Sequence, residues 1–230
     1  MTIGIICALD IEAESIVQTM TDRKSEDIGG IRFEVGKISD KTVVCAICGI
    51  GKVCAAMCAQ TMIVKYSPDA VINTGIAGTL TEELGVGDIA LSTALVQHDI
   101  DVYDLDRTPL GHHPSLGIIE FPADKTIVDK IEAIIKDLGM KVKRGVIATG
   151  DQFISKTEIK EKLSSVFGAI ACEMEGGAIA QVCYMNKVPF AVVRSISDGA
   201  NENSFEDYNE FKTFSAKKSS ELAIRFVKEM

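Results

Sequence analysis

Short apolar runs alternate along this chain with longer stretches in which apolar residues recur every three or four positions. The short runs are typical of buried strands and the longer stretches of amphipathic helices, so their alternation predicts an α/β fold. The predicted strands are Ile3–Ala8, Ile31–Ile38, Thr42–Cys48, Ala70–Thr74, Asp88–Leu95, Val142–Thr149, Ala169–Cys172 and Phe190–Ser195. The predicted helices are Ile11–Met20, Lys52–Tyr66, Lys125–Leu138, Thr157–Ser165, Glu175–Asn186 and Phe205–Lys228.

The segment Asp99–Pro122 follows neither period and is predicted to be a long loop. Connections of this length without secondary structure of their own are uncommon in compact domains, and those that occur are usually functional. We therefore expect this segment to be a lid over a site or part of an interface.

Residues that suit ligand binding follow several of the predicted strands. Glu12 comes after the first strand, and the glycine-rich "NTGIAG" (73–78) lies at the end of another. "TGDQF" (149–153), "EMEGG" (173–177) and "SISD" (195–198) lie at the ends of three more. In open α/β sheets ligands bind just beyond the carboxyl ends of the strands, so these residues predict one shared site.

Composition and charge narrow the class of protein. The chain has 230 residues and no linker-like or repeated segment, which predicts a single domain over residues 1–230. A net charge of −9 argues against nucleic acid or an anionic membrane as a partner. The N-terminus lacks the basic start of a signal peptide, and no apolar run approaches the length of a membrane span. We expect a soluble cytoplasmic protein.

Metal, redox and nucleotide-cofactor chemistry find little support in the sequence. The seven cysteines lie in apolar segments, as reduced core cysteines of a cytoplasmic protein do. The three histidines lack the spacing of metal ligands. "CGIGKVCAA" (48–56) has the spacing of neither a P-loop nor a dinucleotide motif, and its simpler interpretation is a tight strand-to-helix turn. No nucleophile elbow of a serine hydrolase is present.

Three acids in apolar surroundings carry the strongest chemical signal. A buried carboxylate costs free energy unless it is paired or hydrogen-bonded. Glu175 has a structural interpretation as a charge in a first helical turn, and Asp198 has one as a turn residue. Glu173 has one as the partner of a buried Arg194. Several acids at adjacent strand ends favour a functional site, but the residues alone leave both interpretations open.

A set of motifs occurs in one order over nearly the whole chain: "IGIICALDIEAE", "GIGKVCAA", "INTGIAG", "LGVGDI", "ATGDQFI", "EMEGGAIAQVC" and "PFAVVRSISD". Each motif is weak alone, but the ordered set closely resembles the 5′-methylthioadenosine/S-adenosylhomocysteine nucleosidase family of the nucleoside phosphorylase superfamily. The resemblance implies a single α/β domain with a mixed, twisted, partly barrel-like sheet flanked by helices. It also implies a homodimer without cofactor or metal.

The implied reaction is hydrolysis of the N9–ribose bond of an adenine nucleoside, as used in methionine salvage. The implied substrates are 5′-methylthioadenosine, S-adenosylhomocysteine and 5′-deoxyadenosine. Glu12 matches the acid that activates water, and Asp198 matches the acid that protonates adenine N7. These roles fit the chemistry, because cleavage builds an oxocarbenium-like ribose and pushes electrons onto the purine. Asp198 must then hold a proton near neutral pH while Glu12 stays basic.

The resemblance assigns further positions to substrate binding. Glu175 matches the acid that binds both ribose hydroxyls, and Met174 packs against the ribose. Phe153 matches the ring stacked on adenine, a contact that contributes about 1–3 kcal/mol in other base-binding proteins. The matched binding positions are Gly78, Phe153, Ile154, Met174, Glu175, Arg194, Ser197 and Tyr208.

The sequence departs from the family pattern in places. Many members have a serine where this chain has Ile76, near the attacking water, and a phenylalanine where it has Tyr208. The segment after His98 matches the family only as far as Val102. By the resemblance, residues Val102–Leu105 contribute to the 5′-substituent pocket of a partner subunit.

Three alternatives stay open at this point. A purine nucleoside phosphorylase would use phosphate as its nucleophile, but the loop "ALDIEAE" (8–14) is acidic where phosphate would bind. A hydrolase of a futalosine-type nucleoside would use the same kind of site. A nucleoside-binding protein without turnover would not require both Glu12 and Asp198.

Overall fold

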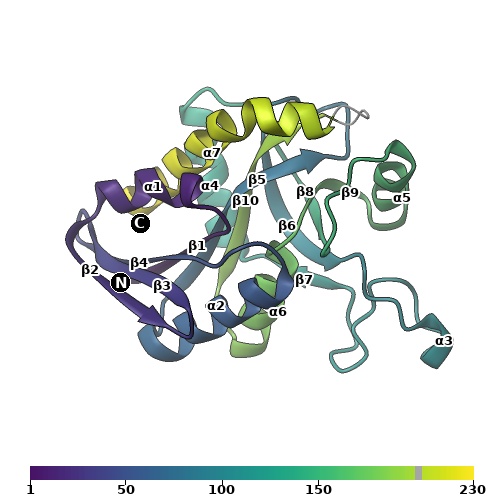
Figure 1. The fold of residues 1–230 in the computed structure, drawn as a ribbon, viewed down its shortest axis with the longest axis horizontal. Coiled ribbons are helices and arrows are strands. Elements are labelled where there is room, and N and C mark those ends of the chain that lie inside the picture. Colours follow the sequence, from purple (N-terminus) through teal and green to yellow (C-terminus); the bar gives the residue numbers. More distant parts are fainter. Residues whose placement is uncertain (200–203) are drawn as a thin grey trace.

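The computed structural model describes residues 1–199 and 204–230, and in them ten strands form one sheet. The strands are β1 (Thr2–Cys7), β2 (Thr21–Ile28), β3 (Ile31–Ile38), β4 (Lys41–Ile47), β5 (Ala70–Thr79), β6 (Ile89–Gln97), β7 (Glu120–Pro122), β8 (Val142–Thr149), β9 (Ala169–Glu173) and β10 (Phe190–Asp198). The helices are α1 (Asp10–Thr19), α2 (Lys52–Tyr66), α3 (Tyr103–Asp106), α4 (Lys125–Asp137), α5 (Thr157–Phe167), α6 (Gly176–Asn186) and α7 (Ser204–Glu229). Figure 1 shows their arrangement.

Part of the sheet closes into a barrel of five strands. The order around the barrel is β5, β10, β6, β8 and β9, and β9 pairs with β5 again. From β5 the sheet continues outward through β1, β4, β3 and β2, and β7 pairs with β6. The pairs β1–β5, β5–β10 and β8–β9 are parallel, whereas β5–β9 and β6–β10 are antiparallel. The predicted mixed, partly barrel-like sheet is therefore confirmed.

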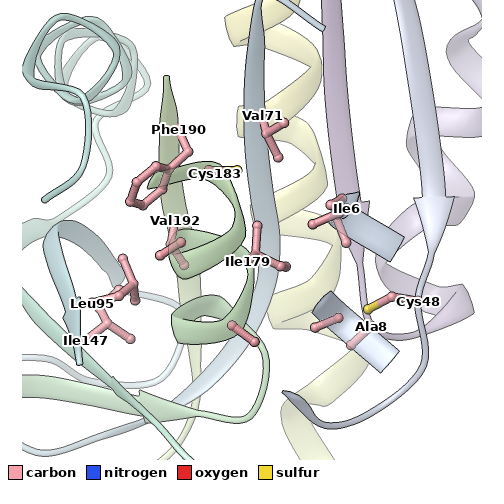
Figure 2. Close-up of a cluster of buried hydrophobic side chains, with 14 of the residues drawn as sticks. Ile6, Ala8, Cys48, Val71, Leu95, Ile147, Ile179, Cys183, Phe190 and Val192 are labelled. Carbon is pink, nitrogen blue, oxygen red and sulfur yellow. The ribbon is translucent and has the colours of Figure 1, made fainter. Parts of the chain in front are cut away.

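The central strands are apolar on both faces because helices cover both. In β1, Ile6 packs in a core with side chains of α2 and α6, whereas Ile5 and Cys7 pack with side chains of α1, α4 and α7. Figure 1 shows these two helical layers on opposite sides of the sheet, and Figure 2 shows Ile179 and Cys183 of α6 among side chains of β5 and β10. Successive side chains of a strand point to opposite faces, so a strand buried on both appears as a continuous apolar run.

Helix α4 follows the sequence pattern closely. Its buried residues recur every three or four positions and form one stripe: Ile127, Val128, Ile131, Ile134 and Ile135. Asp124 is the N-cap, and its Oδ1 accepts a hydrogen bond from the N–H of Ile127 at 2.9 Å. An N-cap of this kind satisfies one of the free N–H groups of the first turn. Apolar spacing and capping together define this helix.

The structure differs from the predicted elements in several places. Strand β2 was not predicted because "TDRKSEDI" is almost entirely polar, which suits an exposed strand at the edge of a sheet. The segment predicted to be a loop, 99–122, contains α3 and β7, and it projects from the body of the molecule (Figure 1). Helix α6 begins at Gly176, and Glu175 is its N-cap. None of the described helices is both long and apolar enough to span a membrane.

Candidate active site

A cavity of about 420 Å³ lies where β1, β5, β9 and β10 end, a volume typical of small-molecule sites. Nine of the ten predicted site residues line it: Glu12, Gly78, Phe153, Met174, Glu175, Arg194, Ser197, Asp198 and Tyr208. The tenth, Ile154, lines a smaller cavity that also has Gly78, Phe153 and Asp198 in its wall. The fold therefore brings together residues that lie far apart in the sequence.

Two glycines of β5 make room for the charged side chains of β10. The parallel register of these strands places Gly75 beside Arg194 and Gly78 beside Asp198. A Cβ atom on Gly75 would lie 2.3 Å from Arg194 Nη1 and 2.6 Å from Glu12 Oε1. A Cβ atom on Gly78 would lie 2.7 Å from Asp198 Oδ2. The glycines of "NTGIAG" thus accommodate three charged side chains of the chain itself.

Glu12 lies in the first turn of α1, and its carboxylate is buried. Its Oε2 accepts hydrogen bonds from the N–H groups of Ala8 (2.8 Å) and Leu9 (2.9 Å). Its Oε1 accepts one from the N–H of Ile76 at 3.1 Å. Burial raises the pKa of Glu12, while the charge of Arg194 and the three N–H groups oppose the rise. A carboxylate that is fixed in position and made more basic suits proton abstraction from water.

Glu173 and Arg194 form the buried ion pair that the structural interpretation of Glu173 predicted. The Oε2 atom of Glu173 accepts hydrogen bonds from Arg194 Nη2 and from the N–H groups of Glu175 (3.0 Å) and Gly176 (2.7 Å). Its Oε1 accepts one from the hydroxyl of Thr149. Both oxygens are therefore bonded within the protein, and Glu173 holds Arg194 and the start of α6 in place.

Glu175 is buried at the N-cap of α6 and lines the cavity. Its Oε1 accepts a hydrogen bond from the N–H of Gly51 (2.9 Å), and its Oε2 lies 3.6 Å from Arg194 Nη2. Burial raises the pKa of Glu175 to about 7, and the negative charges of Glu173 and Glu12 add to the rise. The positive charge of Arg194 and the hydrogen bond from the Gly51 N–H oppose it. An ionised carboxylate offers about four lone-pair positions, so Glu175 keeps acceptor capacity for ligand hydroxyl groups.

Asp198 ends β10 and is buried beside Gly78. Its Oδ1 accepts a hydrogen bond from Ser197 Oγ at 2.8 Å. The next residue, Gly199, accepts a hydrogen bond from Lys160 of α5 and donates one to Asp207 of α7 at 3.2 Å. Side chains of α5 and α7 therefore fix the backbone that directly follows Asp198.

Phe153 and Tyr208 form the aromatic part of the cavity wall. Their ring centroids are 5.6 Å apart and the rings are nearly perpendicular, at 75°. Phe153 is 47% exposed and lines the cavity, so its ring is accessible to a ligand. A planar base can stack on such a ring. The pKa of Tyr208 is raised by burial and by the nearby acids.

The charges around the cavity favour a neutral or positively charged ligand over an anion. Among the described residues that line it, Arg194 is the only cation, and four are acids: Glu12, Glu173, Glu175 and Asp198. Arg194 Nη2 donates to Glu173 and to Asn73 Oδ1 (2.5 Å), and its Nη1 donates to the carbonyl of Ile76 (3.4 Å). Both terminal nitrogens of the guanidinium therefore donate to groups of the protein, whereas the buried Nε has no partner among the described residues. Within the described residues no group of three or more His, Cys, Asp or Glu is placed to hold a metal ion.

The sequence did not single out several residues that line the cavity, among them Leu9, Ile50 and Phe205. Their apolar side chains carry no reactive group. Ile50 and Phe205 are exposed large apolar residues, at 56% and 64%. Ile50 lies between the two glycines of "GIG", and that position at a strand-to-helix turn was the one signal that pointed to it.

The model of the phosphorylase superfamily matches residues 2–230. A 5′-methylthioadenosine/S-adenosylhomocysteine nucleosidase of Shewanella loihica is 38% identical over 234 residues, which cover 100% of both chains. A solved structure is also similar: a mutant of the Helicobacter pylori enzyme of that name, with 5′-methylthioadenosine in its active site. Its sequence is 35% identical and its TM-score is 0.96, and the match covers 100% of this chain and 99% of that chain.

The futalosine hydrolase of Helicobacter pylori strain 26695 is also similar, with 34% identity, a TM-score of 0.95 and coverage of 100% of this chain and 98% of that chain. The likeness in sequence and in structure extends over the full length in each case. This chain belongs to the phosphorylase superfamily and, within it, to the family of 5′-methylthioadenosine/S-adenosylhomocysteine nucleosidases.

Proposed function

We propose that this protein hydrolyses the N-glycosidic bond of 5′-methylthioadenosine and S-adenosylhomocysteine, and also of 5′-deoxyadenosine. The products are adenine and the 5′-substituted ribose. The observation that carries the proposal is one cavity that holds the buried acids Glu12, Glu175 and Asp198 next to the open ring of Phe153. The names of the relatives support the same reaction.

Asp198 acts on the leaving base in this proposal. As the bond between C1′ and N9 breaks, its electron pair moves onto adenine, and protonated Asp198 donates its proton to N7. The hydroxyl of Ser197 donates to Asp198 Oδ1, and the absence of a side chain on Gly78 leaves room for the carboxyl group. Phe153 stacks on the base, and the backbone of Ile154 contacts its edge.

Glu12 and Glu175 act on the sugar side. A water molecule forms the new C1′–O bond and gives its proton to Glu12, whose carboxylate is held by three backbone N–H groups. Glu175 accepts hydrogen bonds from the 2′- and 3′-hydroxyls, and Met174 packs against the ribose. Ile76 takes part through its N–H to Glu12, so no side-chain hydroxyl from this position holds the water.

Water is a better nucleophile for this cavity than phosphate. A phosphate dianion would lie beside Glu12 and Glu175, and like charges at close range in a buried site repel strongly. The cation on the cavity wall, Arg194, is already paired with Glu173. Hydrolysis is therefore favoured over phosphorolysis.

A substrate panel tests the proposal. Purified protein is incubated separately with 5′-methylthioadenosine, S-adenosylhomocysteine, 5′-deoxyadenosine and futalosine, and the released base is measured by chromatography. We expect adenine from the first three, and Asp198→Asn is the inactive control. The similarity to a futalosine hydrolase makes the fourth compound a specific alternative. Base release from futalosine alone would overturn the proposal in favour of that alternative.

The proposal includes a homodimer. Four exposed apolar side chains form what we call the α2 surface: Ile50, Val53, Met57 and Val64. Apolar groups gathered on one face of a protein commonly mark an interface. Ile50 also lines the cavity, so a partner bound here would reach the active site. We assign residues 102–105, including the 83% exposed Leu105, to the 5′-substituent pocket of the partner subunit.

The cytoplasm is the compartment we propose, with methionine salvage as the process. Hydrolysis of 5′-methylthioadenosine returns adenine and a methylthio sugar, which retains the sulfur of methionine. Six of the seven cysteine thiols are buried and Cys54 is partly buried, and all seven are free. Free thiols in this number are consistent with a reducing compartment.

A further inference from the structure

Three polar residues outside the cavity form a closed ring of hydrogen bonds at the N-terminus of α2. Asp99 Oδ1 accepts from Lys52 Nζ at 2.6 Å, and Asp99 Oδ2 accepts from the N–H of Asp151 at 3.0 Å. Asp151 Oδ1 in turn accepts from the N–H of Lys52 at 2.7 Å. The ring ties together the segment after β6, the segment after β8 and the first residue of α2.

Gly51, which directly precedes Lys52, contacts the active site through its backbone. Gly51 donates its N–H to Glu175 Oε1 at 2.9 Å. Its φ of 96° and ψ of 163° are accessible to glycine and strained for other residues. A Cβ atom at this position would lie 3.0 Å from Asp151 Oδ1. Gly51 directly precedes Lys52, whose backbone and side chain are both bonded in the ring.

We propose that Asp99 and Asp151 are positioning residues for the ribose-binding carboxylate: they fix Lys52, and through it the Gly51 N–H that orients Glu175. The inference rests on the proposed role of Glu175 as the acceptor of the ribose hydroxyls. It adds two residues that act on substrate affinity from outside the cavity, and it links the projecting segment that begins at Asp99 to the sugar side of the site.

The ionic part of the ring lies in a partly buried setting. The side chains of Lys52 and Asp99 are 18% and 21% exposed, so water screens their attraction less than at an open surface. Burial raises the pKa of Asp99, but the hydrogen bonds and charge of Lys52 and the N–H of Asp151 outweigh it, and the pKa lies below its usual range. Asp99 is therefore ionised at neutral pH and keeps Lys52 in place.

The ring acts on Glu175 through a single hydrogen bond. The titratable groups that face Glu175 come from five other elements or their ends: Arg194, Glu173, Glu12, Cys48 and Tyr208. The Gly51 N–H lowers the pKa of Glu175 against the rise caused by burial. Loss of that N–H would leave Glu175 both less well oriented and protonated up to a higher pH.

The test compares Asp99→Asn and Asp151→Asn with Asp106→Asn, which removes the same charge from an exposed position in the same projecting segment. We expect KM for 5′-methylthioadenosine to rise about threefold to tenfold in the first two variants, the factor that one hydrogen bond contributes. We expect kcat to change less and Asp106→Asn to behave as wild type. Circular dichroism and the Tm show whether each variant is folded. An unchanged KM in both folded variants would overturn the proposal.

Two further measurements separate positioning from a general structural effect. In a Glu175→Ala background, Asp99→Asn should have no further effect on KM, because the side chain that accepts the Gly51 N–H is gone. An undiminished further effect there would show that the ring acts elsewhere, for example through Phe153, and would overturn the proposal. A ¹³C NMR titration of the Glu175 carboxyl should give a pKa higher by about 0.5 to 1 in Asp99→Asn than in wild type.

This titration needs no turnover, so it stays informative if the proposed reaction is wrong. Absence of adenine release by the wild-type protein would count against the proposed function alone. An unchanged Glu175 titration in Asp99→Asn and Asp151→Asn would count against the ring as a positioning device.

Discussion

At the scale of single residues, the buried acids differ in how many donors the protein supplies to each. Glu173 is bonded at both oxygens by Arg194, Thr149 and two backbone N–H groups. Glu12 has three backbone N–H donors and no partner side chain within hydrogen-bond distance among the described residues. Glu175 has one N–H donor and a pKa of about 7. Fewer fixed donors leave more of the carboxylate for a ligand, which separates the structural acid Glu173 from Glu12 and Glu175, the two for which we propose a role in the reaction.

The roles of Glu12 and Asp198 can be tested by isosteric substitution. We expect Glu12→Gln and Asp198→Asn each to lower kcat by about 10²–10⁴-fold, the usual contribution of a general acid or base. Calorimetry should show that both variants still bind 5′-methylthioadenosine. Glu14→Gln, on the same helix but exposed, is the matched control. Wild-type kcat in either active-site variant would show that the assigned role is wrong.

The pKa of Glu175 makes a prediction about pH. Its value of about 7 lies above the ordinary value, so lowering the pH below 7 protonates the group and removes an acceptor for the ribose hydroxyls. We expect the affinity for the nucleoside to be nearly full about one pH unit above 7, to be about half of that at pH 7, and to fall up to about tenfold for each pH unit below it. Calorimetric titrations over this range measure the effect. Glu175→Gln should bind weakly at every pH, and an unchanged pH dependence in that variant would assign the titration to another group.

At the scale of elements, the pairing of β5 with β10 builds the centre of the site. The register sets Gly75 beside Arg194 and Gly78 beside Asp198, so each glycine lies where a charged side chain needs space. A β-branched residue would suit a buried strand better, and two glycines in β5 weaken it. At these two positions of β5, space for the charged side chains of the site replaces the residue types that strands prefer.

Gly75→Ala tests this relation. Its Cβ would collide with Arg194 Nη1 and Glu12 Oε1, neither of which is free to move. We expect a loss of about 1–3 kcal/mol in the free energy of unfolding, as for other overpacked cores, together with a large loss of kcat. Gly85→Ala is the control, because its Cβ would meet only Asp88 Oδ2 at 3.8 Å. Chemical denaturation and initial rates measure both effects, and equal results for the two variants would contradict the account.

The sequence predicted those elements whose residues carry their own pattern. Strand β1 is apolar on both faces and α4 has a regular buried stripe, and both lie where expected. Strand β2 is polar except for Ile28, because it lies at the edge of the sheet, and only its pairing with β3 defines it. The glycine-rich "NTGIAG" was predicted to belong to the site, but which side chains lie against its glycines depends on the register of β10, which no local pattern encodes.

The site residues, too, could be predicted only where a sequence motif marks them. The ordered motifs led to ten positions, and the fold brings them to one cavity and its smaller neighbour. The ring of Asp99, Lys52 and Asp151 was not foreseen, because its members lie in three segments and single charged residues in loops are common in any sequence. Only their distances show that they form a unit.

At the scale of the whole molecule, the α2 surface carries the proposal of a homodimer. We expect Val53→Glu combined with Val64→Glu to give a monomer in analytical ultracentrifugation, because two buried charges without partners would oppose association. Val166→Glu, an exposed valine on α5, is the matched control and should leave the dimer intact. The monomer should also show a raised KM, since it lacks the partner's residues 102–105 at its 5′ pocket. A dimer that survives the double substitution would show that the interface lies elsewhere.

We propose that this protein cleaves the nucleoside with water rather than with phosphate. The identity of the sugar product distinguishes the two nucleophiles when 5′-methylthioadenosine is incubated with the protein in the absence and in the presence of saturating inorganic phosphate. The acids Glu12 and Glu175, together with the pairing of Arg194 with Glu173, lead us to expect free methylthioribose and adenine at the same rate in both conditions. Formation of methylthioribose 1-phosphate, with a rate that depends on phosphate, would contradict the account.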